Sequence, residues 1–130
     1  MNILCKDGSI NGHNQYISIP YEIIESALIT AFEQGSYYWA HIEWEDPRTN
    51  CKGRFEDLLE EGWSIVFTDI VSGEHLGVLT LESIKNNMGK FKKGIEEYPH
   101  MWHEFMDYGG DSNVADIALQ YWVMGAEVYC

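Results

Sequence analysis

The most regular feature of this sequence is an apolar pattern between residues 81 and 95 that fits one face of an α-helix. Its members are spaced by three, four, three and four residues, the spacing that a period of about 3.6 residues produces. Thr80 directly precedes the pattern, and a threonine there can accept a hydrogen bond from the first turn of a helix. The sequence therefore predicts an amphipathic helix over residues 81–95. Its apolar face consists of Leu81, Ile84, Met88, Phe91 and Ile95.

Further segments combine helical spacing with start and stop signals. Pro20 suits the first turn of a helix, because the N–H that proline lacks would be unpaired there. Gly35 suits the left-handed end of the same helix. The further predicted helices are residues 20–34, residues 55–62, a short helix from Pro99, and a last helix that is capped by Ser112 or Asn113 and ends at Gly125.

Three runs rich in aromatic and β-branched residues predict strands, at 36–44, 63–71 and 76–79. Ser72-Gly73 separates the last two runs, as expected of an antiparallel hairpin. The sequence thus predicts an α+β fold, a small antiparallel sheet with helices packed on one face. A chain of 130 residues leaves no room for a second core, so residues 1–130 form a single domain. Residues 1–15 are expected to be a turn-rich N-terminal lead, because they show no apolar period.

Net charge restricts the partners that such a chain can have. It has 8 Lys and Arg against 21 Asp and Glu, a formal charge of −13, which repels nucleic acids, so direct binding to them is not expected. No apolar run approaches the ~20 residues of a membrane span, and no basic region followed by an apolar stretch marks the N-terminus. Three cysteines are an odd number for a disulfide framework. We therefore expect a cytoplasmic protein without membrane contact.

One group of side chains has the composition of a metal site. On a helix, His100, His103 and Asp107 project from one side, and two imidazoles with a carboxylate can bind a divalent transition metal. The alternative is a solvated polar face, which needs no metal. We expect the solvated face, because the zinc-binding spacing His-Glu-x-x-His is absent.

Catalytic signals are also weak. The loop residue Cys51 lies beside Lys52 and Arg54, which can lower a thiol pKa, but no orienting base can be assigned to it. The glycine- and lysine-rich run 89–94 lacks the Gly-Lys-Ser/Thr ending of a phosphate-binding loop. It is better explained as the basic end of the helix that contains it. We therefore expect no catalytic residues and no cofactor.

Acidic residues are concentrated at the end of the chain, where residues 96–130 contain seven carboxylates and no Lys or Arg. Carboxylates on a folded surface can take the place of phosphates in the cationic groove of a nucleic-acid-binding protein. The alternative is an acidic surface that serves only solubility. The candidate partner-binding residues are Glu96, Glu97, Glu104, Asp107, Asp111 and Asp116.

Aromatic residues suggest a different ligand. The chain has 5 Trp and 8 Tyr, and flat rings can stack on bases. One face of the strand predicted at 36–44 would carry three rings, with lysines from the helix at 81–95 as phosphate partners. The alternative is that these rings belong to the core. The candidate ligand-binding residues are Tyr37, Trp39, His41, Lys90, Lys92 and Lys93.

Two segments resemble a family of small proteins encoded by bacteriophages and prophages. The first is Gly35-Ser36-Tyr37-Tyr38-Trp39, after a helix that begins near Ile19-Pro20. The second is the stretch 111–125, with an Ala115-Asp116 pair, Gln120, Gly125 and a tyrosine near the terminus. The family's usual Gly-Glu-x-x-Tyr-Gly ending is replaced here by 126–130, Ala-Glu-Val-Tyr-Cys.

This resemblance implies a phage protein that works by binding in the host bacterial cytoplasm. The first expectation is a counter-defence inhibitor of the anti-CRISPR kind, which occludes the nucleic-acid site of a basic host defence protein. The second is a sponge that holds a cyclic nucleotide or an ADP-ribose-type signal between aromatic rings, as an oligomer. An open sheet edge is one reason to expect self-association. The third is a minor phage enzyme or a virion-associated protein.

Overall fold

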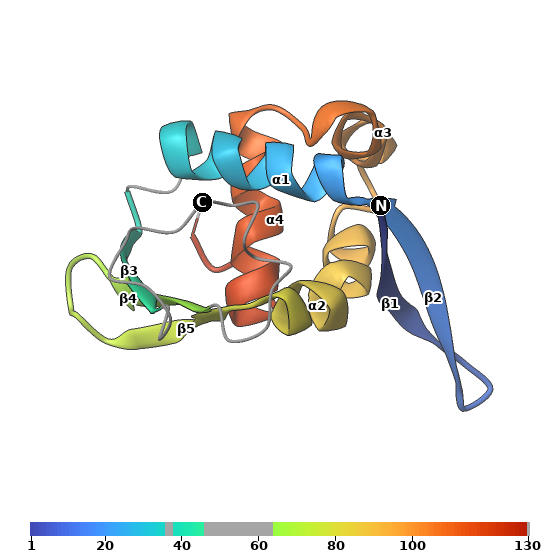
Figure 1. The fold of residues 1–130 in the computed structure, drawn as a ribbon, viewed down its shortest axis with the longest axis horizontal. Coiled ribbons are helices and arrows are strands. Elements are labelled where there is room, and N and C mark those ends of the chain that lie inside the picture. The colour runs from blue at the N-terminus through green and yellow to red at the C-terminus, as the bar shows by residue number, and fades with distance from the viewer. Residues whose placement is uncertain (36–37, 46–63, 130) are drawn as a thin grey trace.

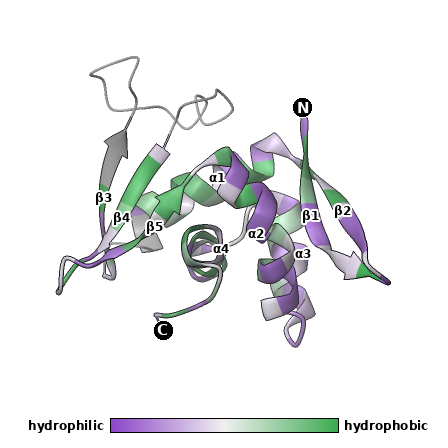
Figure 2. Ribbon diagram, turned by 90° about the horizontal axis from the view of Figure 1, so that it is seen from below, coloured by the Kyte–Doolittle hydropathy of each residue, from purple (hydrophilic) through white to green (hydrophobic). Residues whose placement is uncertain are grey.

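The computed structural model describes residues 1–35, 38–45 and 64–129. Within these ranges it contains two antiparallel sheets and four α-helices, which confirms the α+β class. Figures 1 and 2 show the helices between a three-stranded sheet at one end and a two-stranded hairpin at the other. The prediction of one small sheet therefore missed the second. The helix predicted at 55–62 lies outside the described residues.

The three-stranded sheet has the order β3-β4-β5. Strands β4 (Ser64–Asp69) and β5 (His75–Leu79) form the hairpin predicted around Ser72-Gly73. The carboxylate of Asp69 stabilises the turn, because its Oδ1 accepts hydrogen bonds from the amides of Val71 at 2.8 Å and Ser72 at 2.9 Å. Strand β3 (Ala40–Glu45) is shorter than the predicted run, because the described residues before Ala40 form a turn.

Helix α2 (Leu81–Gly94) follows the predicted pattern closely. Ile84, Met88 and Phe91 are buried, and Thr80 forms a capping box with Ser83, in which each side chain accepts a hydrogen bond from the other residue's amide, at 3.0 and 2.9 Å. The glycine- and lysine-rich run 89–94 is helical throughout, which confirms its assignment to the basic end of this helix.

The other helices are also near their predicted positions. Helix α1 (Tyr21–Thr30) continues as a π-helical turn, η1 (Ala31–Gly35), and α3 spans Pro99–Tyr108. Helix α4 (Ser112–Met124) ends at Gly125 as predicted. Its cap was predicted wrongly as Ser112 or Asn113: the Asp111 carboxylate accepts the hydrogen bond from the amide of Val114, at 2.9 Å.

The N-terminal segment is not the irregular lead that we expected. Strands β1 (Asn2–Ile10) and β2 (His13–Pro20) form an antiparallel hairpin. Asn11 and Gly12 connect them with φ values of 52° and 80°, and Asn-Gly is the dipeptide best suited to a two-residue turn with positive φ. The inward face of the hairpin consists of Ile3, Cys5, Ile17 and Ile19.

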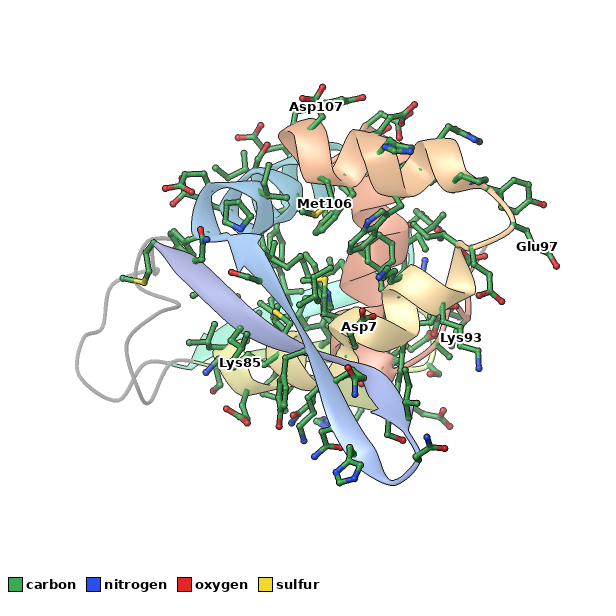
Figure 3. All side chains as sticks on the ribbon, turned by 90° about the vertical axis from the view of Figure 1, so that its right-hand side faces the viewer. Asp7, Lys85, Lys93, Glu97, Met106 and Asp107 are labelled. Carbon is green, nitrogen blue, oxygen red and sulfur yellow. The ribbon has the colours of Figure 1, made fainter. Side chains whose placement is uncertain are left out.

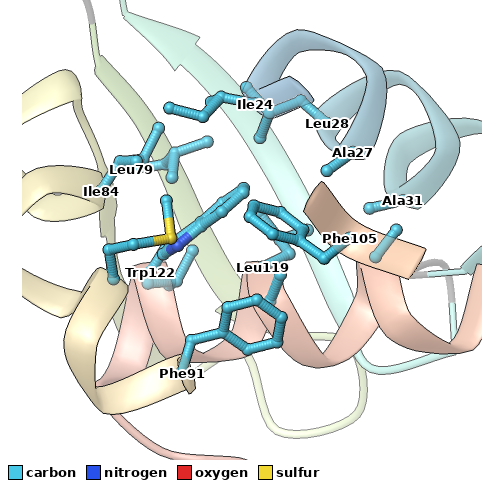
Figure 4. Packing of buried hydrophobic residues seen from close by; sticks show 14 of the residues in the cluster. Ile24, Ala27, Leu28, Ala31, Leu79, Ile84, Phe91, Phe105, Leu119 and Trp122 are labelled. Carbon is cyan, nitrogen blue, oxygen red and sulfur yellow. The ribbon is translucent and has the colours of Figure 1, made fainter. Parts of the chain in front are cut away.

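The core lies between the helices and extends to the inner faces of both sheets. Helix α4 packs against α1, α2 and β5, and α2 also packs against β1. Figure 4 shows aromatic rings from three helices meeting here: Phe91, Phe105 and Trp122. None of the described helices has the length and apolarity that crossing a membrane requires.

The backbone of α2 passes very close to the backbone of β1 at Gly89. A Cβ atom at this position would lie 2.7 Å from the carbonyl oxygen of Lys6 and 2.8 Å from the Cα of Asp7. Alanine normally stabilises a helix interior relative to glycine. We expect the reverse here: Gly89→Ala lowers the free energy of unfolding by about 1–3 kcal/mol, because backbone atoms must move apart.

Denaturant unfolding measures this effect, and Asn86→Ala on the exposed side of α2 is the matched control. The control changes the stability by less than about 0.5 kcal/mol. A Gly89→Ala protein as stable as the wild type would show that the two backbones are not in close contact.

Candidate functional site

Three carboxylates, here called the acidic cluster, gather at the C-terminal end of α3: Glu104, Asp107 and Asp111. Partial desolvation, and then the negative charges of Glu104, Asp111 and Asp107, raise the pKa of Tyr108, the last residue of α3. Asp107 and Asp111 are exposed and Glu104 is partly exposed. These three predicted partner-binding residues therefore lie close together in the chain around the end of α3, and their role in partner binding stays a prediction.

Two further predicted residues, Glu96 and Glu97, lie in the turn before α3 and are exposed. We call them the acidic turn. Figure 3 shows Glu97 and Asp107 near opposite ends of α3, a helix of 10 residues and therefore about 15 Å long. The two groups of carboxylates are thus held apart by a rigid helix on one side of the molecule.

The sixth predicted residue, Asp116, is not on this surface. It is only 6% exposed, because α4 turns it inward toward Trp39. Its assignment as a partner-binding charge is therefore corrected to a buried structural role.

The described positive charge lies on two elements, and one of them, α2, ends with Lys92 and Lys93 directly before the acidic turn. Every lysine that the structure describes is on β1 or α2, and the described ranges contain no arginine. Lys92 donates a hydrogen bond to Asp7 at 3.0 Å and lies 5.6 Å from the centre of the Trp102 ring. Figure 3 shows Lys85 and Lys93 below α3, away from Asp107. The described lysines are Lys6, Lys85, Lys90, Lys92 and Lys93.

The predicted aromatic ligand face does not form. Trp39 is 1% exposed, and its ring stacks on Phe67 and Tyr129, with centroid distances of 5.7 and 5.3 Å. It lies in the turn before β3, so the strand alternation that placed it beside His41 does not apply. His41 is exposed, and Tyr37 lies outside the described residues. Lys90, Lys92 and Lys93 belong to α2, where Lys92 contacts Asp7 and Trp102.

The candidate metal ligands are not assembled either. His100, His103 and Asp107 are exposed on α3, and no group of three His, Cys, Asp or Glu among the described residues is placed to hold a metal ion. Cys5 is fully buried, and this burial raises its pKa to about 11, so its thiol stays protonated and is a poor nucleophile. Cys51 and Cys130 lie outside the described residues.

A buried hydrogen-bond network joins α4 to the segment before β3. The indole Nε1 of Trp39 donates to Asp116 Oδ1 at 2.7 Å. The hydroxyl of Tyr38 donates to Asp116 Oδ2 at 2.7 Å, and the Gln120 amide donates to the same oxygen at 3.0 Å. Desolvation of its hydroxyl, and then the hydrogen bond to Asp116, raise the pKa of Tyr38 well above the usual value for tyrosine. Tyr38 therefore remains a hydroxyl donor at physiological pH.

The same glutamine holds the C-terminal segment. Gln120 is fully buried, and its Oε1 accepts hydrogen bonds from the amides of Val128 at 2.9 Å and Tyr129 at 2.8 Å. Its amide also donates to the Tyr129 carbonyl at 3.1 Å. The Tyr129 hydroxyl then donates to Asp69 Oδ2 at 2.6 Å. These bonds fasten residues 128–129 across α4 and onto the β4–β5 turn.

The hydrogen bond from Tyr129 to Asp69 leads us to expect a pH-dependent contribution to stability. The hydrogen bond from Tyr129, followed by the amides of Ser72 and Val71, lowers the pKa of Asp69 from 3.8 to about 2. Because the folded pKa is depressed, the stability that the carboxylate contributes is fully present above pH 3.8 and is lost as the pH falls toward 2. We expect the Asp69 carboxyl carbon to titrate near pH 2 by NMR.

Tyr129→Phe removes the strongest of these bonds and should move that midpoint upward, toward 3.8. The amides of Ser72 and Val71 still bond to the carboxylate and keep the midpoint below 3.8. A wild-type midpoint at 3.8 contradicts the contact.

A pocket of about 360 Å³ opens beside the network. Its walls come from segments far apart in the sequence, including the end of α2, α3, α4 and the C-terminal segment. Tyr38, Tyr98 and Tyr129 line it together with the carboxylates of Asp116 and Glu127. Sequence reasoning did not find this pocket. One signal was present: Asp116 and Gln120 are four residues apart, and therefore on one helix face, within an otherwise apolar stretch.

No protein-family model, curated protein or solved structure matches the chain. Four described residues of the segments 35–39 and 111–125 belong to the network, in which Tyr38, Trp39 and Gln120 each donate a hydrogen bond to Asp116. Two segments separated by more than 70 residues in the sequence thus meet at one place.

Proposed function

We propose that this chain is a phage-encoded counter-defence protein of the anti-CRISPR kind. It binds a basic host effector through the acidic cluster and the acidic turn, and it occludes the groove that the effector uses for nucleic acid. The observation that supports this function best is the composition of α3 and the segments that flank it: residues 96–111 contain five carboxylates and no Lys or Arg, whereas the described lysines lie on β1 and α2.

The position of the acidic cluster adds a second argument. The C-terminal end of a helix carries a partial negative charge, so acidic side chains there destabilise it, typically by about 0.3–1 kcal/mol each. Glu104 and Asp107 lie near this end of α3, and no basic residue lies in its last turn. Glu104 and Asp107 therefore lower the stability of α3 and strengthen the local negative potential. This combination is expected of a surface that serves binding.

Rigidity supports the proposal further. Phosphates in a duplex are presented at regular positions, and a competitor needs charges that are already in place. Helix α3 provides this, because Phe105 anchors it in the core through edge-to-face contact with Phe91, with ring centroids 5.1 Å apart. The nucleotide-sequestering alternative receives no such support, since Trp39 is buried and the described pocket is lined by carboxylates that repel phosphate.

Competition for nucleic acid tests this function. The chain is titrated into a panel of purified guide-loaded CRISPR effectors and other basic host nucleases, each holding a fluorescent DNA. Fluorescence anisotropy then reports release of the DNA. We expect release from a target effector at about 50 mM salt and a markedly weaker effect at about 300 mM, because exposed charges are screened. No release from any member at low salt argues against the proposed function.

A further inference from the structure

The pocket beside the buried network is distinct from the surface that we propose for the effector. Its apolar lining includes Ile95 at the end of α2 and Ile117 on α4. Tyr98 borders it and is 53% exposed. With a volume of about 360 Å³, it lies at the lower end of the range of small-molecule sites. A ligand there must be small and partly apolar.

The charge of the pocket restricts the ligand further. Glu127 is exposed and lines the pocket. The described lining contains no Lys, Arg or His, so no basic side chain of the lining neutralises the charge of Glu127. Its charge contributes to the raised pKa of Tyr38, so it lies near the Tyr38 hydroxyl that also bonds to Asp116. Anionic ligands are therefore repelled from this position.

The aromatic rings add to the same preference. The face of a tyrosine ring carries negative electrostatic potential and attracts ammonium and guanidinium groups within about 6 Å. Three tyrosines line the pocket: Tyr38 and Tyr98, which are 52% and 53% exposed, and Tyr129, whose ring is stacked on Trp39. A bare metal ion fits poorly, because the described residues offer no group of three metal-ligating side chains and the pocket is lined in part by apolar groups.

We propose that this pocket binds an organic cation, a guanidinium or alkylammonium group on a short apolar stem. The charged group lies near Glu127 and the tyrosine rings, and the stem lies against Ile95 and Ile117. This binding uses neither the acidic cluster nor the two carboxylates of the acidic turn, although Ile95 and Tyr98 lie on either side of that turn. The guanidinium group occurs in small free guanidines and in arginine side chains, and the test distinguishes these sources.

The probe is butylguanidinium, and butylurea is a neutral control of nearly the same shape. Backbone amide shifts in NMR titrations report both affinity and position. We expect saturable binding of butylguanidinium with a Kd at or below about 1 mM, with shifts at Tyr98 and Ile117, and no saturation with butylurea. A parallel titration with the peptide Gly-Arg-Gly distinguishes the sources: binding of both probes extends the site to protein-borne arginine, and binding of butylguanidinium alone assigns it to free cations.

Two variants test the residues that carry the argument, and each has a control of matched exposure. Tyr98→Ala should weaken binding about two- to fivefold, as loss of an exposed cation–π contact predicts, and Glu127→Gln should weaken it similarly. The exposed residues Tyr16 and Glu82 lie outside the pocket, so Tyr16→Ala and Glu82→Gln should bind as the wild type does. Equal binding of butylurea, shifts elsewhere on the protein, or unchanged affinity in both pocket variants overturns the proposal.

Discussion

Replacing Asp116 with alanine is expected to lower the free energy of unfolding by about 3–5 kcal/mol. Asp116 is 6% exposed and accepts hydrogen bonds from Trp39, Tyr38 and Gln120. Its loss leaves the indole N–H of Trp39 buried without an acceptor, because that side chain is only 1% exposed. It also releases Gln120, which holds the C-terminal segment.

Denaturant unfolding monitored by tryptophan fluorescence measures this loss. Asp116→Asn keeps one acceptor oxygen for Trp39 and should lose roughly half as much stability. Asp107→Ala is the control for removing a carboxylate, and its stability should be unchanged or slightly higher, because this residue lies at the negative end of α3. An Asp116→Ala protein within about 0.5 kcal/mol of the wild type contradicts the network.

Reversing two charges of the acidic cluster should weaken effector binding about 100-fold, because repulsion replaces attraction at the interface. The variant is Glu104→Lys with Asp107→Lys. Asp111 is left intact, because it caps α4. Each reversal adds two charge units, so the formal net charge changes from −13 to −9.

The matched control is Glu74→Lys with Glu82→Lys, which produces the same net charge on exposed positions away from α3. We expect it to bind within about threefold of the wild type at physiological salt, where charges separated by more than a Debye length are largely screened. Equal weakening in both double variants would mean that net charge alone, rather than the acidic cluster, attracts the effector.

Local patterns predicted most of the helices and the β4–β5 hairpin. Helix α2 was found because its apolar period, its Thr80 cap and its basic end are all contiguous in the sequence. The β1–β2 hairpin was missed although Asn11-Gly12 indicates such a turn. Its buried apolar residues alternate only near the base of the two strands, and its tip, Ile10 included, is exposed.

The candidate site was less predictable because it depends on contacts between distant segments. Charge along the chain indicated Glu104, Asp107 and Asp111 as neighbours, since all three lie close together in sequence, but it did not show that Asp116 is buried. The burial of Trp39 depends on Asp116 and Tyr129, which are 77 and 90 residues away. No local period shows that a tyrosine from the C-terminal segment will cover that ring, so the sequence left Trp39 open between a ligand face and the core; its burial confirms the core.

Amide hydrogen exchange on the complex with the effector tests the central claim most directly. It compares the free chain with the chain bound to an effector that releases its DNA. We expect slower exchange of the amides of residues 96–97 and 107–111, with β1, β2 and the lysine-bearing side of α2 exchanging as in the free chain. Protection confined to the β1–β2 hairpin or to α2, with residues 96–111 unchanged, contradicts the assignment of the acidic surface as the site of binding.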